Sequence, residues 1–466
     1  MNIMETLRAS SYIIPVKLES EEGKYMLIHG YTGAMDIVSE DLLNSIMDIN
    51  SVSDLSSETL QILKTRGYIT TKSQDEEFAY VARIAKALHR KCEVLSTVFT
   101  WVVTYNCNFR CPYCFEGRKS KDGNVRIVFT KEMVDNAYYA MDRIQPYKQL
   151  RSNVITLYGG EPLLSENKEI ITYIVEEGMK RGYSFVAVTN GYEVDCFEDL
   201  LGEDKIRKLQ ITIDGPKEMH NKRRIHFQDD NTFDKIVSNI ALALHKGVKI
   251  VVRVNIDNSN INDFKDLKTF FEQNGFCSYS NFQMYAALLK DNDSIMEVEH
   301  QSLNFLSMKS FINQRKQYDS SSQGLDYGIY KNIYKAIFEK RSVHFKSISC
   351  AAQANGYVLD PLGNIYPCWE VIGKKECVEG KYSSDGVSWS KEVLQQWRNT
   401  TIGQKKPCNH CKYALLCGGG CPYYHMLGNH MQCVLFPKSL YLAVNKAFKE
   451  LKTSINQKIS NYGKGV

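Results

Sequence analysis

The sequence FTWVVTYNCNFRCPYC, residues 99–114, joins an apolar run to three closely spaced cysteines. The pattern of residues 99–104 predicts a β-strand. Cys107, Cys111 and Cys114 follow at its carboxyl end in a CxxxCxxC spacing. Three thiolates on one short loop can bind three irons of a 4Fe-4S cluster and leave the fourth iron without a protein ligand. A structural zinc site is the alternative, but zinc takes four ligands and no fourth Cys or His lies close in sequence.

Strand and helix patterns alternate from residue 94 onward. Six such units imply a parallel sheet with crossover helices. Because Gly, Asn, Asp and Cys stand just after the predicted strands, we predict an α/β fold built on a partial (β/α)6 TIM-like barrel, with function at the carboxyl ends of its strands. The predicted strands cover residues 99–104, 153–158, 185–189, 208–213, 249–256 and 281–286, and the predicted helices cover residues 131–144, 166–180, 232–246 and 262–273.

The cysteine run resembles the signature of the radical S-adenosylmethionine (SAM) superfamily, including the aromatic Tyr113 before the third cysteine. One unit later, Gly159-Gly160-Glu161-Pro162 is similar to the GGEP motif of that family, which binds the amino group of SAM. The two glycines would let a ligand approach the backbone, and Glu161 would accept a hydrogen bond from an ammonium. An ordinary turn is the alternative interpretation of this motif.

Two further segments resemble the same family with lower specificity. The Thr-Asn-Gly turn at residues 189–191 places Asn190 near SAM, and the Thr-Ile-Asp-Gly stretch at residues 212–215 places Asp214 there. The resemblance also implies that Arg223 pairs with the SAM carboxylate in a charge-assisted contact. Asn-Gly and Asp-Gly are equally typical of plain turns, with a solvated arginine nearby.

The C-terminal third carries eight more cysteines between Cys350 and Cys433. Seven of them resemble the SPASM extension, which holds two auxiliary 4Fe-4S clusters in peptide- and protein-modifying radical SAM enzymes. With the first cysteine run, the resemblance implies three clusters in total. A zinc ribbon is the alternative for residues 408–421. The seven are Cys350, Cys368, Cys408, Cys411, Cys417, Cys421 and Cys433.

Seven ligands cannot fill the eight positions of two clusters. The family's interleaved ligation would assign Cys408, Cys411, Cys417 and Cys433 to one cluster and Cys350, Cys368 and Cys421 to the other. The missing eighth ligand is open between Cys377, His344 and a substrate thiolate at an open iron.

The first residues suggest a separate module. Strand patterns at residues 12–18 and 24–29 precede helical spacing at residues 41–47 and 58–65, which predicts a winged-helix-like module similar to leader-binding elements of peptide maturases. We therefore predict five regions: 1–92 for this module and a connecting helix, 93–300 for the radical SAM core, 301–345 for a helical bridge, 346–440 for the SPASM domain, and 441–466 for a C-terminal helix and tail.

Composition excludes several other classes of function. The net charge of +5 arises from 58 basic and 53 acidic residues, which is a weak basis for binding nucleic acid. The longest apolar stretch, near residues 94–103, is too short to span a membrane, and the N-terminus has no signal-peptide pattern. We expect a cytoplasmic protein, where closely spaced cysteines indicate metal rather than disulfides.

The resemblance implies that reductive SAM cleavage yields a 5′-deoxyadenosyl radical, which removes hydrogen from an unactivated carbon. Sulfatase-maturing relatives place Asp after the second SPASM cysteine, whereas this chain has Trp369 followed by Glu370. We therefore predict a maturase that cross-links a ribosomally made precursor peptide bearing a leader, through a thioether first and a carbon–carbon bond next. An electron donor such as flavodoxin or ferredoxin is implied, and no catalytic residue is assigned. A sulfatase-maturing-type oxidase and a non-catalytic Fe-S electron carrier or redox sensor are the alternatives.

Overall fold

The computed structural model describes residues 7–48, 55–95, 97–116, 127–289, 310–311, 327–405, 407–428 and 431–462. The chain folds into two compact units. We call residues 94–324 and 355–397 the barrel unit, and residues 1–93, 325–354 and 398–466 the terminal unit. Of the helical bridge predicted at residues 301–345, residues 301–309 and 312–326 lie outside the described residues. No helix of the described residues is long and apolar enough to cross a membrane.

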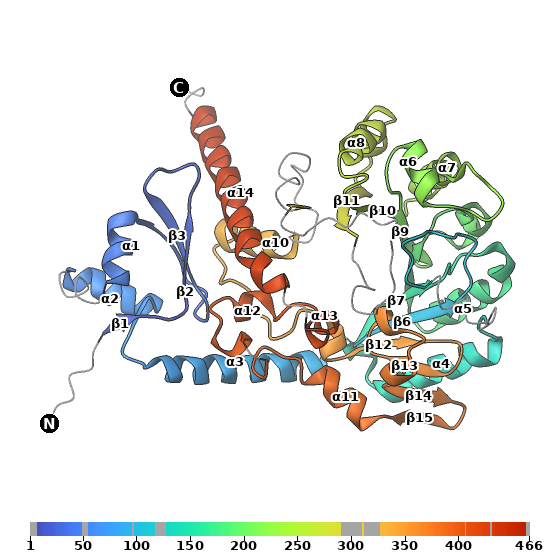
Figure 1. Ribbon diagram of the computed structural model, residues 1–466, viewed down its shortest axis with the longest axis horizontal. Helices are drawn as coiled ribbons and strands as arrows, with labels where there is room; N and C mark the ends of the chain where they lie inside the picture. The colour runs from blue at the N-terminus through green and yellow to red at the C-terminus, as the bar shows by residue number, and fades with distance from the viewer. Residues whose placement is uncertain are drawn as a thin grey trace. The chain divides into compact units, whose positions relative to one another are not determined.

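The barrel unit is built on one ten-stranded sheet (Figure 1). Six of its strands are parallel neighbours in the order β11-β10-β9-β8-β7-β6, and each occupies a segment predicted to be a strand. Most of their buried positions are apolar, as expected for a parallel sheet covered by helices. These strands are β6 (Thr97–Thr104), β7 (Arg151–Gly159), β8 (Ser184–Thr189), β9 (Ile206–Thr212), β10 (Lys249–Ile256) and β11 (Phe282–Leu288).

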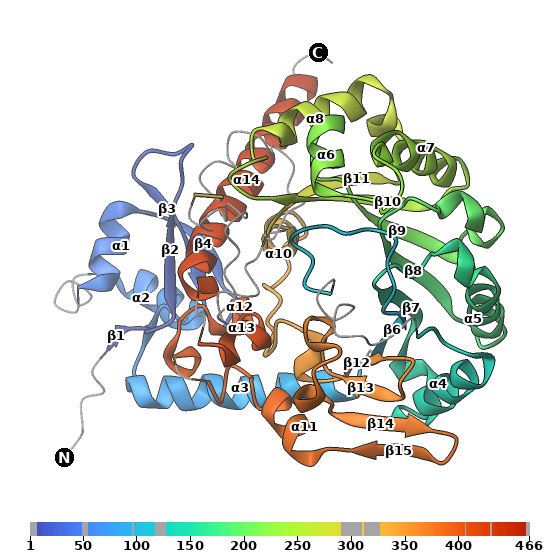
Figure 2. The ribbon, with the colours of Figure 1, turned by 45° about the vertical axis from the view of Figure 1, so that its right-hand side comes forward.

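The crossover helices cover the outer face of this curved sheet, as Figure 2 shows. All except the short α6 bury an apolar stripe: for example, α4 buries Val134 and Met141, and α5 buries Ile171 and Ile174. The fold prediction of an α/β partial barrel is thus confirmed. The helices are α4 (Lys131–Ile144), α5 (Lys168–Lys180), α6 (Lys217–Arg223), α7 (Thr232–His245) and α8 (Asp263–Gln273), and a 3-10 segment (Val194–Leu200) joins β8 to β9.

Four strands that we did not predict extend the sheet beyond β6. Strand β12 (Gly356–Leu359) pairs in parallel with β6, and β13 (Asn364–Tyr366), β14 (Gly380–Ser383) and β15 (Gly386–Trp389) continue as antiparallel strands. Helix α11 (Lys391–Arg398) follows. Cys368 therefore stands directly after a strand of the same sheet that carries the first three cysteines.

The terminal unit begins with small strands and helices. A three-stranded antiparallel sheet has the order β2-β3-β4, and β1 pairs with β5. Ser39 and Ser56 cap α1 and α2, and Gly67 ends α2 in the left-handed conformation. The winged-helix assignment stays a prediction. The elements are β1 (Arg8–Ala9), β2 (Ile13–Lys17), β3 (Lys24–His29), β4 (Met35–Ser39), α1 (Glu40–Met47), α2 (Ser57–Arg66), β5 (Ile69–Thr70) and the long α3 (Gln74–Val94).

The two ends of the chain share apolar cores within this unit. Residues of β2 and β3 pack with α10 (Tyr327–Phe338) and α14 (Met431–Tyr462) in one buried cluster. A second cluster joins Val81 and Ala85 of α3 to Ile402, Cys408 and Leu415. The N-terminal strands and α3 therefore contribute directly to the core that surrounds the C-terminal cysteines. The short helices α12 (Ala414–Cys417) and α13 (Pro422–Met426) lie in this C-terminal part.

Candidate functional site

The carboxyl-end loops and inner strand faces of the barrel unit line a cavity of about 1120 Å³. All three cysteines of the first run line it, together with Tyr113, Gly159, Gly160, Glu161 and Asn190. Five of the seven predicted SAM contacts thus line the same cavity as the three cluster cysteines, whereas Asp214 and Arg223 do not line it. The cavity is large enough for a ligand of drug-like size or larger.

Main-chain contacts hold the cysteine loop against the segment after α6. Phe109 forms an isolated antiparallel bridge with His226, and the Arg110 N–H donates to the Ile225 carbonyl at 2.6 Å. The Phe227 N–H donates to the Asn108 carbonyl at 3.1 Å. Phe109 itself is buried, so the loop is anchored between Cys107 and Cys111 by both backbone and side chain. Anchoring of this kind keeps three thiols on one wall of the cavity.

The Gly159-Gly160 pair is needed for contact with this cysteine loop. A Cβ atom on Gly159 would lie 2.2 Å from the Thr104 carbonyl oxygen, and one on Gly160 would lie 2.2 Å from the Asn106 oxygen. The Gly160 N–H instead donates to the Thr104 carbonyl at 3.0 Å. We expected the glycines to admit a ligand, and the structure gives them a packing role between β6 and β7. Gly159 also has φ +131°, which favours glycine.

Glu161 is buried and already accepts three hydrogen bonds. Its carboxylate accepts from the Thr189 hydroxyl at 2.6 Å, from the Leu163 N–H at 2.8 Å and from the Asn190 N–H at 2.5 Å. Burial raises the pKa of Glu161 to about 7, although these hydrogen bonds oppose the shift. A carboxylate so placed in the cavity wall has an unusually costly negative charge, which a cationic ligand group would stabilise.

Asn190 connects the turn after β8 to the cysteine loop. Its side-chain amide donates to the Asn108 side-chain oxygen at 2.7 Å, and its own oxygen accepts from the Tyr192 N–H at 2.9 Å. Asn108 stands between Cys107 and Phe109. Asn190 is therefore hydrogen-bonded to the loop that carries the cysteines. It helps to position that loop and also lines the cavity.

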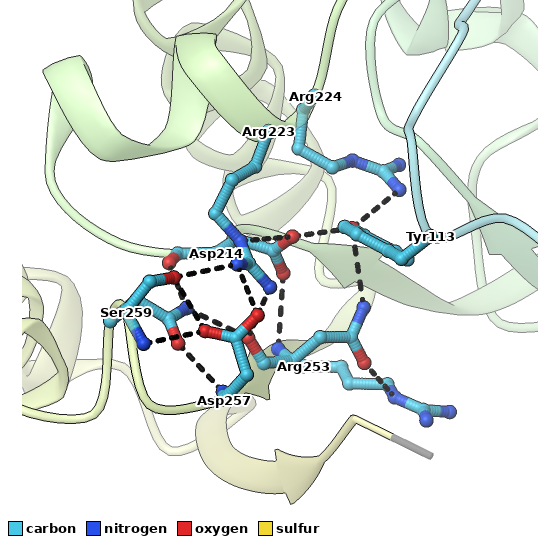
Figure 3. Close-up of polar contacts among 9 residues, drawn as sticks. Tyr113, Asp214, Arg223, Arg224, Arg253, Asp257 and Ser259 are labelled. Carbon is cyan, nitrogen blue, oxygen red and sulfur yellow. Dashed lines mark hydrogen bonds and ion pairs between the residues drawn. The ribbon is translucent and has the colours of Figure 1, made fainter. Parts of the chain in front are cut away.

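Asp214 and Arg223 form a buried ionic network beside the cavity (Figure 3). The Arg223 guanidinium lies 3.4 Å from Asp214 Oδ2 and 2.6 Å from Asp257 Oδ2. Asp214 also accepts from the Tyr113 hydroxyl and from the Asn255 N–H, the latter at 3.0 Å. Arg223 stacks over the Tyr113 ring with its guanidinium carbon 5.3 Å from the centroid. Both residues therefore contact Tyr113 and help to hold it in place. The positive charge of Arg223 is already paired with Asp214 and Asp257.

Arg224, the next residue, lines the cavity. One of its terminal nitrogens donates to the Tyr113 hydroxyl at 3.3 Å, and its guanidinium lies 5.3 Å from the centroid of the Phe109 ring. Its buried Nε has no hydrogen-bond partner among the described residues. Sequence reasoning favoured Arg223 for an anionic ligand group; adjacent arginines on a helix end cannot be told apart by pattern.

Two aromatic side chains form another part of the wall. Tyr158 stacks on Trp369 with ring centroids 5.4 Å apart and an interplanar angle of 18°. Trp369 is half-exposed and, with Glu370, lines the cavity directly after Cys368. Sequence reasoning did not identify Tyr158, because its position before the Gly-Gly pair gives no sign of a distant stacking partner.

The remaining predicted cluster ligands divide between the two units. Cys368 and Cys377 belong to the barrel unit, and both are half-buried. In the terminal unit Cys408 is buried, Cys411, Cys417 and Cys421 are half-buried, and Cys350, Cys433 and His344 are exposed. Across the described ranges no three His, Cys, Asp or Glu side chains converge on a site for a single metal ion.

Residues 101–271 match the radical SAM superfamily. The cysteine-type anaerobic sulfatase-maturating enzyme of Clostridium novyi is 22% identical over 334 residues, covering 68% of this chain and 85% of the relative. The GTP 3′,8-cyclase of Campylobacter fetus is 27% identical over 176 residues, covering 37% of this chain and 51% of the relative. A solved structure, native anSMEcpe with bound AdoMet and Cp18Cys peptide, is similar with a TM-score of 0.53 and 18% identity, covering 75% of this chain and 99% of that one. The chain is therefore an enzyme that carries a radical SAM domain at residues 101–271.

Proposed function

We propose that this enzyme matures a ribosomally made precursor peptide by removing hydrogen from one of its carbons and forming a cross-link, with a thioether favoured over a carbon–carbon bond. The observation that carries the proposal is the cavity wall in which three cysteines, a buried Glu161 and Arg224 stand together beside an aromatic pair. The relative with 85% coverage acts in protein maturation, as its name states, which supports a polypeptide substrate.

A radical SAM domain uses SAM and a 4Fe-4S cluster, and the residues of the cavity fit both. Cys107, Cys111 and Cys114 would hold the cluster, which leaves one iron for SAM. When bound and given one electron by a donor such as flavodoxin or ferredoxin, this pair would supply a 5′-deoxyadenosyl radical that removes a hydrogen atom from carbon. Glu161 would accept from the SAM ammonium, and Arg224, through its unpartnered Nε, would donate to the SAM carboxylate.

Thioether formation removes two hydrogens from the peptide. One leaves the carbon as a hydrogen atom, and the other leaves the cysteine thiol as a proton together with one electron when the carbon–sulfur bond forms. We assign the proton to a carboxylate of the cavity wall, with Glu370 the one that follows Trp369. We assign the electron to auxiliary 4Fe-4S clusters, held by Cys408, Cys411, Cys417 and Cys433 and by Cys350, Cys368 and Cys421, with Cys377, His344 or substrate as the eighth ligand.

The outer edge of β4 is the proposed binding site for the leader. Strand β4 pairs with β3 and with no other strand of the described residues. The His29 N–H donates to the Ala34 carbonyl at 2.8 Å, so the alternation of an antiparallel ladder directs the main-chain groups of Met35 and Ile37 away from β3. The Arg66 guanidinium donates to the outward Met35 carbonyl at 3.0 Å, so that group already has a partner. Ile37, by contrast, is 48% exposed. An extended peptide can pair with such an edge.

A proline at position 37 tests this edge. Ile37→Pro removes the outward N–H and keeps the hydrogen bonds to β3, because proline is tolerated on edge strands. Ile37→Val is the matched control, since it keeps the N–H and the β-branched side chain. Deleting residues 1–90 would be a poorer test, because those residues share a core with the C-terminal helices.

The measurement is leader-peptide affinity by fluorescence anisotropy, followed by mass spectrometry of the product. We expect Ile37→Pro to weaken leader binding by at least tenfold relative to Ile37→Val. Equal affinity of the two variants would contradict strand addition at β4. A product that has lost two hydrogens and kept all its sulfur supports a cross-link; an aldehyde product without the cysteine sulfur would instead indicate the sulfatase-maturing type of oxidation.

A further inference from the structure

Lys405 is a buried lysine in the terminal unit, with 5% of its surface exposed. It lies just before the 3-10 turn of Cys408–His410, and its main-chain carbonyl accepts from the Asn409 N–H at 3.1 Å. The ammonium donates to the Gly419 carbonyl at 3.3 Å. Within the described ranges it forms no ion pair with a carboxylate. The protein has therefore buried a cation beside the C-terminal cysteines without a carboxylate partner.

The surroundings of the Lys405 ammonium are rich in sulfur. A Cβ atom built on Gly419 would lie 3.7 Å from Lys405 Nζ and 3.8 Å from Cys408 Sγ, so both atoms lie against the same backbone position. The cysteines near enough to act electrostatically on Lys405 are Cys408, Cys421, Cys417 and Cys433, of which Cys408, Cys417 and Cys433 belong to one proposed cluster and Cys421 to the other. Gly418, Gly419 and Gly420 all have positive φ, which wraps the chain between Cys417 and Cys421 around this point.

Burial of an unpaired ammonium is unfavourable, and neutral thiols do little to offset it. A cluster with four thiolate ligands carries net negative charge, so the same ammonium becomes its counter-ion once the cluster is bound. A one-electron reduction adds another negative charge to the cluster. A nearby cation in a low-dielectric environment therefore stabilises the reduced form more than the oxidised form.

We propose that Lys405 is a positioning residue for electron transfer, the internal counter-ion that raises the reduction potential of the auxiliary cluster held by Cys408, Cys411, Cys417 and Cys433. This inference rests on the proposed function, because it requires that cluster. The inference also adds a detail to the proposed function. A higher reduction potential makes the oxidised cluster a better acceptor for the electron that leaves the peptide when the carbon–sulfur bond forms.

Three variants separate charge from other effects. Lys405→Met removes the charge and keeps a long apolar side chain in a buried site, whereas Lys405→Arg keeps the charge. Lys412→Met is the matched control, because Lys412 also neighbours a proposed ligand, Cys411, but is only half-buried and is therefore screened by solvent. Each is made with Cys107, Cys111 and Cys114 replaced by alanine, so that only the auxiliary clusters contribute to the spectra.

The measurements are iron and sulfide content and a redox titration followed by electron paramagnetic resonance. We expect Lys405→Met to disfavour reduction of one auxiliary cluster by at least tenfold, a shift of about 59 mV to lower potential for one electron. Lys405→Arg should stay near the parent, and Lys412→Met should shift less. Cluster loss in Lys405→Met with retention in Lys405→Arg would likewise support the counter-ion role.

Two other outcomes would overturn the inference in different ways. Full iron content with unchanged potentials in Lys405→Met would show that Lys405 has no such role, while the cluster assignment stands. A parent protein that binds no iron at Cys408, Cys411, Cys417 and Cys433, as judged by unaltered iron content after their replacement, would overturn the cluster assignment itself and the inference with it.

Discussion

The substitution Gly160→Ala should disable the enzyme through a backbone collision alone. The new Cβ would stand 2.2 Å from the Asn106 carbonyl oxygen and 2.7 Å from the Tyr105 oxygen, where real Cβ contacts do not fall below 3.0 Å. Both neighbours are main-chain atoms, so the loop has to retreat by about 1 Å. Asn106 directly precedes Cys107, and its carbonyl accepts the Glu161 N–H at 2.7 Å. A displacement of this size at reacting groups costs on the order of 10²-fold in rate.

The assay is 5′-deoxyadenosine formation by chromatography, with iron content and thermal unfolding measured on the same preparations. We expect about a 100-fold loss of SAM cleavage in Gly160→Ala. Gly328→Ala is the control, because Gly328 lies in helix α10 with open space around its Cα, and alanine there should be neutral or stabilise by up to about 1 kcal/mol. SAM cleavage within twofold of wild type at full iron content would refute the packing role assigned to the glycine.

Two further predictions concern charge and pH. Arg224→Met should weaken SAM binding about 10- to 100-fold in calorimetry, because it removes one charge-assisted contact. Arg223→Met should instead lower the free energy of unfolding by about 3 to 5 kcal/mol, seen as a lower thermal unfolding midpoint, because Asp214 and Asp257 stay buried without their cation. Weaker SAM binding in Arg223→Met and lower stability in Arg224→Met would show that the two roles are exchanged. Burial lowers the pKa of His29 from 6.5 to about 4. Between these two pH values the His29 side chain is therefore protonated in the unfolded chain but neutral in the folded chain. The free energy of unfolding should therefore fall by about 2 kcal/mol between pH 7 and pH 5. In denaturant unfolding, the His29→Gln variant should not show this part of the fall.

The barrel could be predicted from sequence because its strands carry strong local signals. The predicted segment 249–256 coincides with β10, Lys249–Ile256, and the predicted segment 131–144 coincides with α4, Lys131–Ile144. Apolar runs of six to nine residues separated by helical periods leave few alternatives to parallel crossover units. The expectation of a site at the carboxyl ends came from the same pattern, since parallel strands bring those ends to one edge, and the cavity lies there.

The four added strands were harder to predict. β12 and β13 have only four and three residues, and the turn between them, with Pro361 and Gly363, indicates at most a local hairpin. The place of β12 beside β6 depends on a pairing across more than 250 residues, such as Gly356 with Val98, and β13 then pairs with β12. Short strands with such distant partners have little local periodicity, so the sheet's extension came from tertiary contacts alone.

The sequence motifs of the site could be predicted, but the contacts that hold their residues in place could not. Glycine signalled close approach, and the approaching group turned out to be the cysteine loop. Arginine signalled an anion, and the structure distinguishes Arg223, paired with two carboxylates, from Arg224 in the cavity wall. Sequence shows which residue types stand near each other in the chain, whereas the direction in which adjacent side chains point is set by the helix end that carries them.

The three motif segments around the cavity are joined into one hydrogen-bonded assembly, and this changes how their variants have to be interpreted. Glu161 binds the turn at Thr189 and Asn190, and Asn190 in turn binds Asn108 of the cysteine loop. A loss of SAM affinity in a Glu161 variant therefore combines a lost ligand contact with a displaced turn and a displaced cysteine loop. Arg224 is the cleaner probe of SAM, since among the described residues its guanidinium donates a hydrogen bond to Tyr113 and none to the Glu161 assembly, although its positive charge also lowers the pKa of Glu161. Coupling between the two sites is then measurable: an Arg224 effect that persists unchanged in a Glu161→Gln background would show independent ligand contacts, because residues acting through one shared loop are not additive.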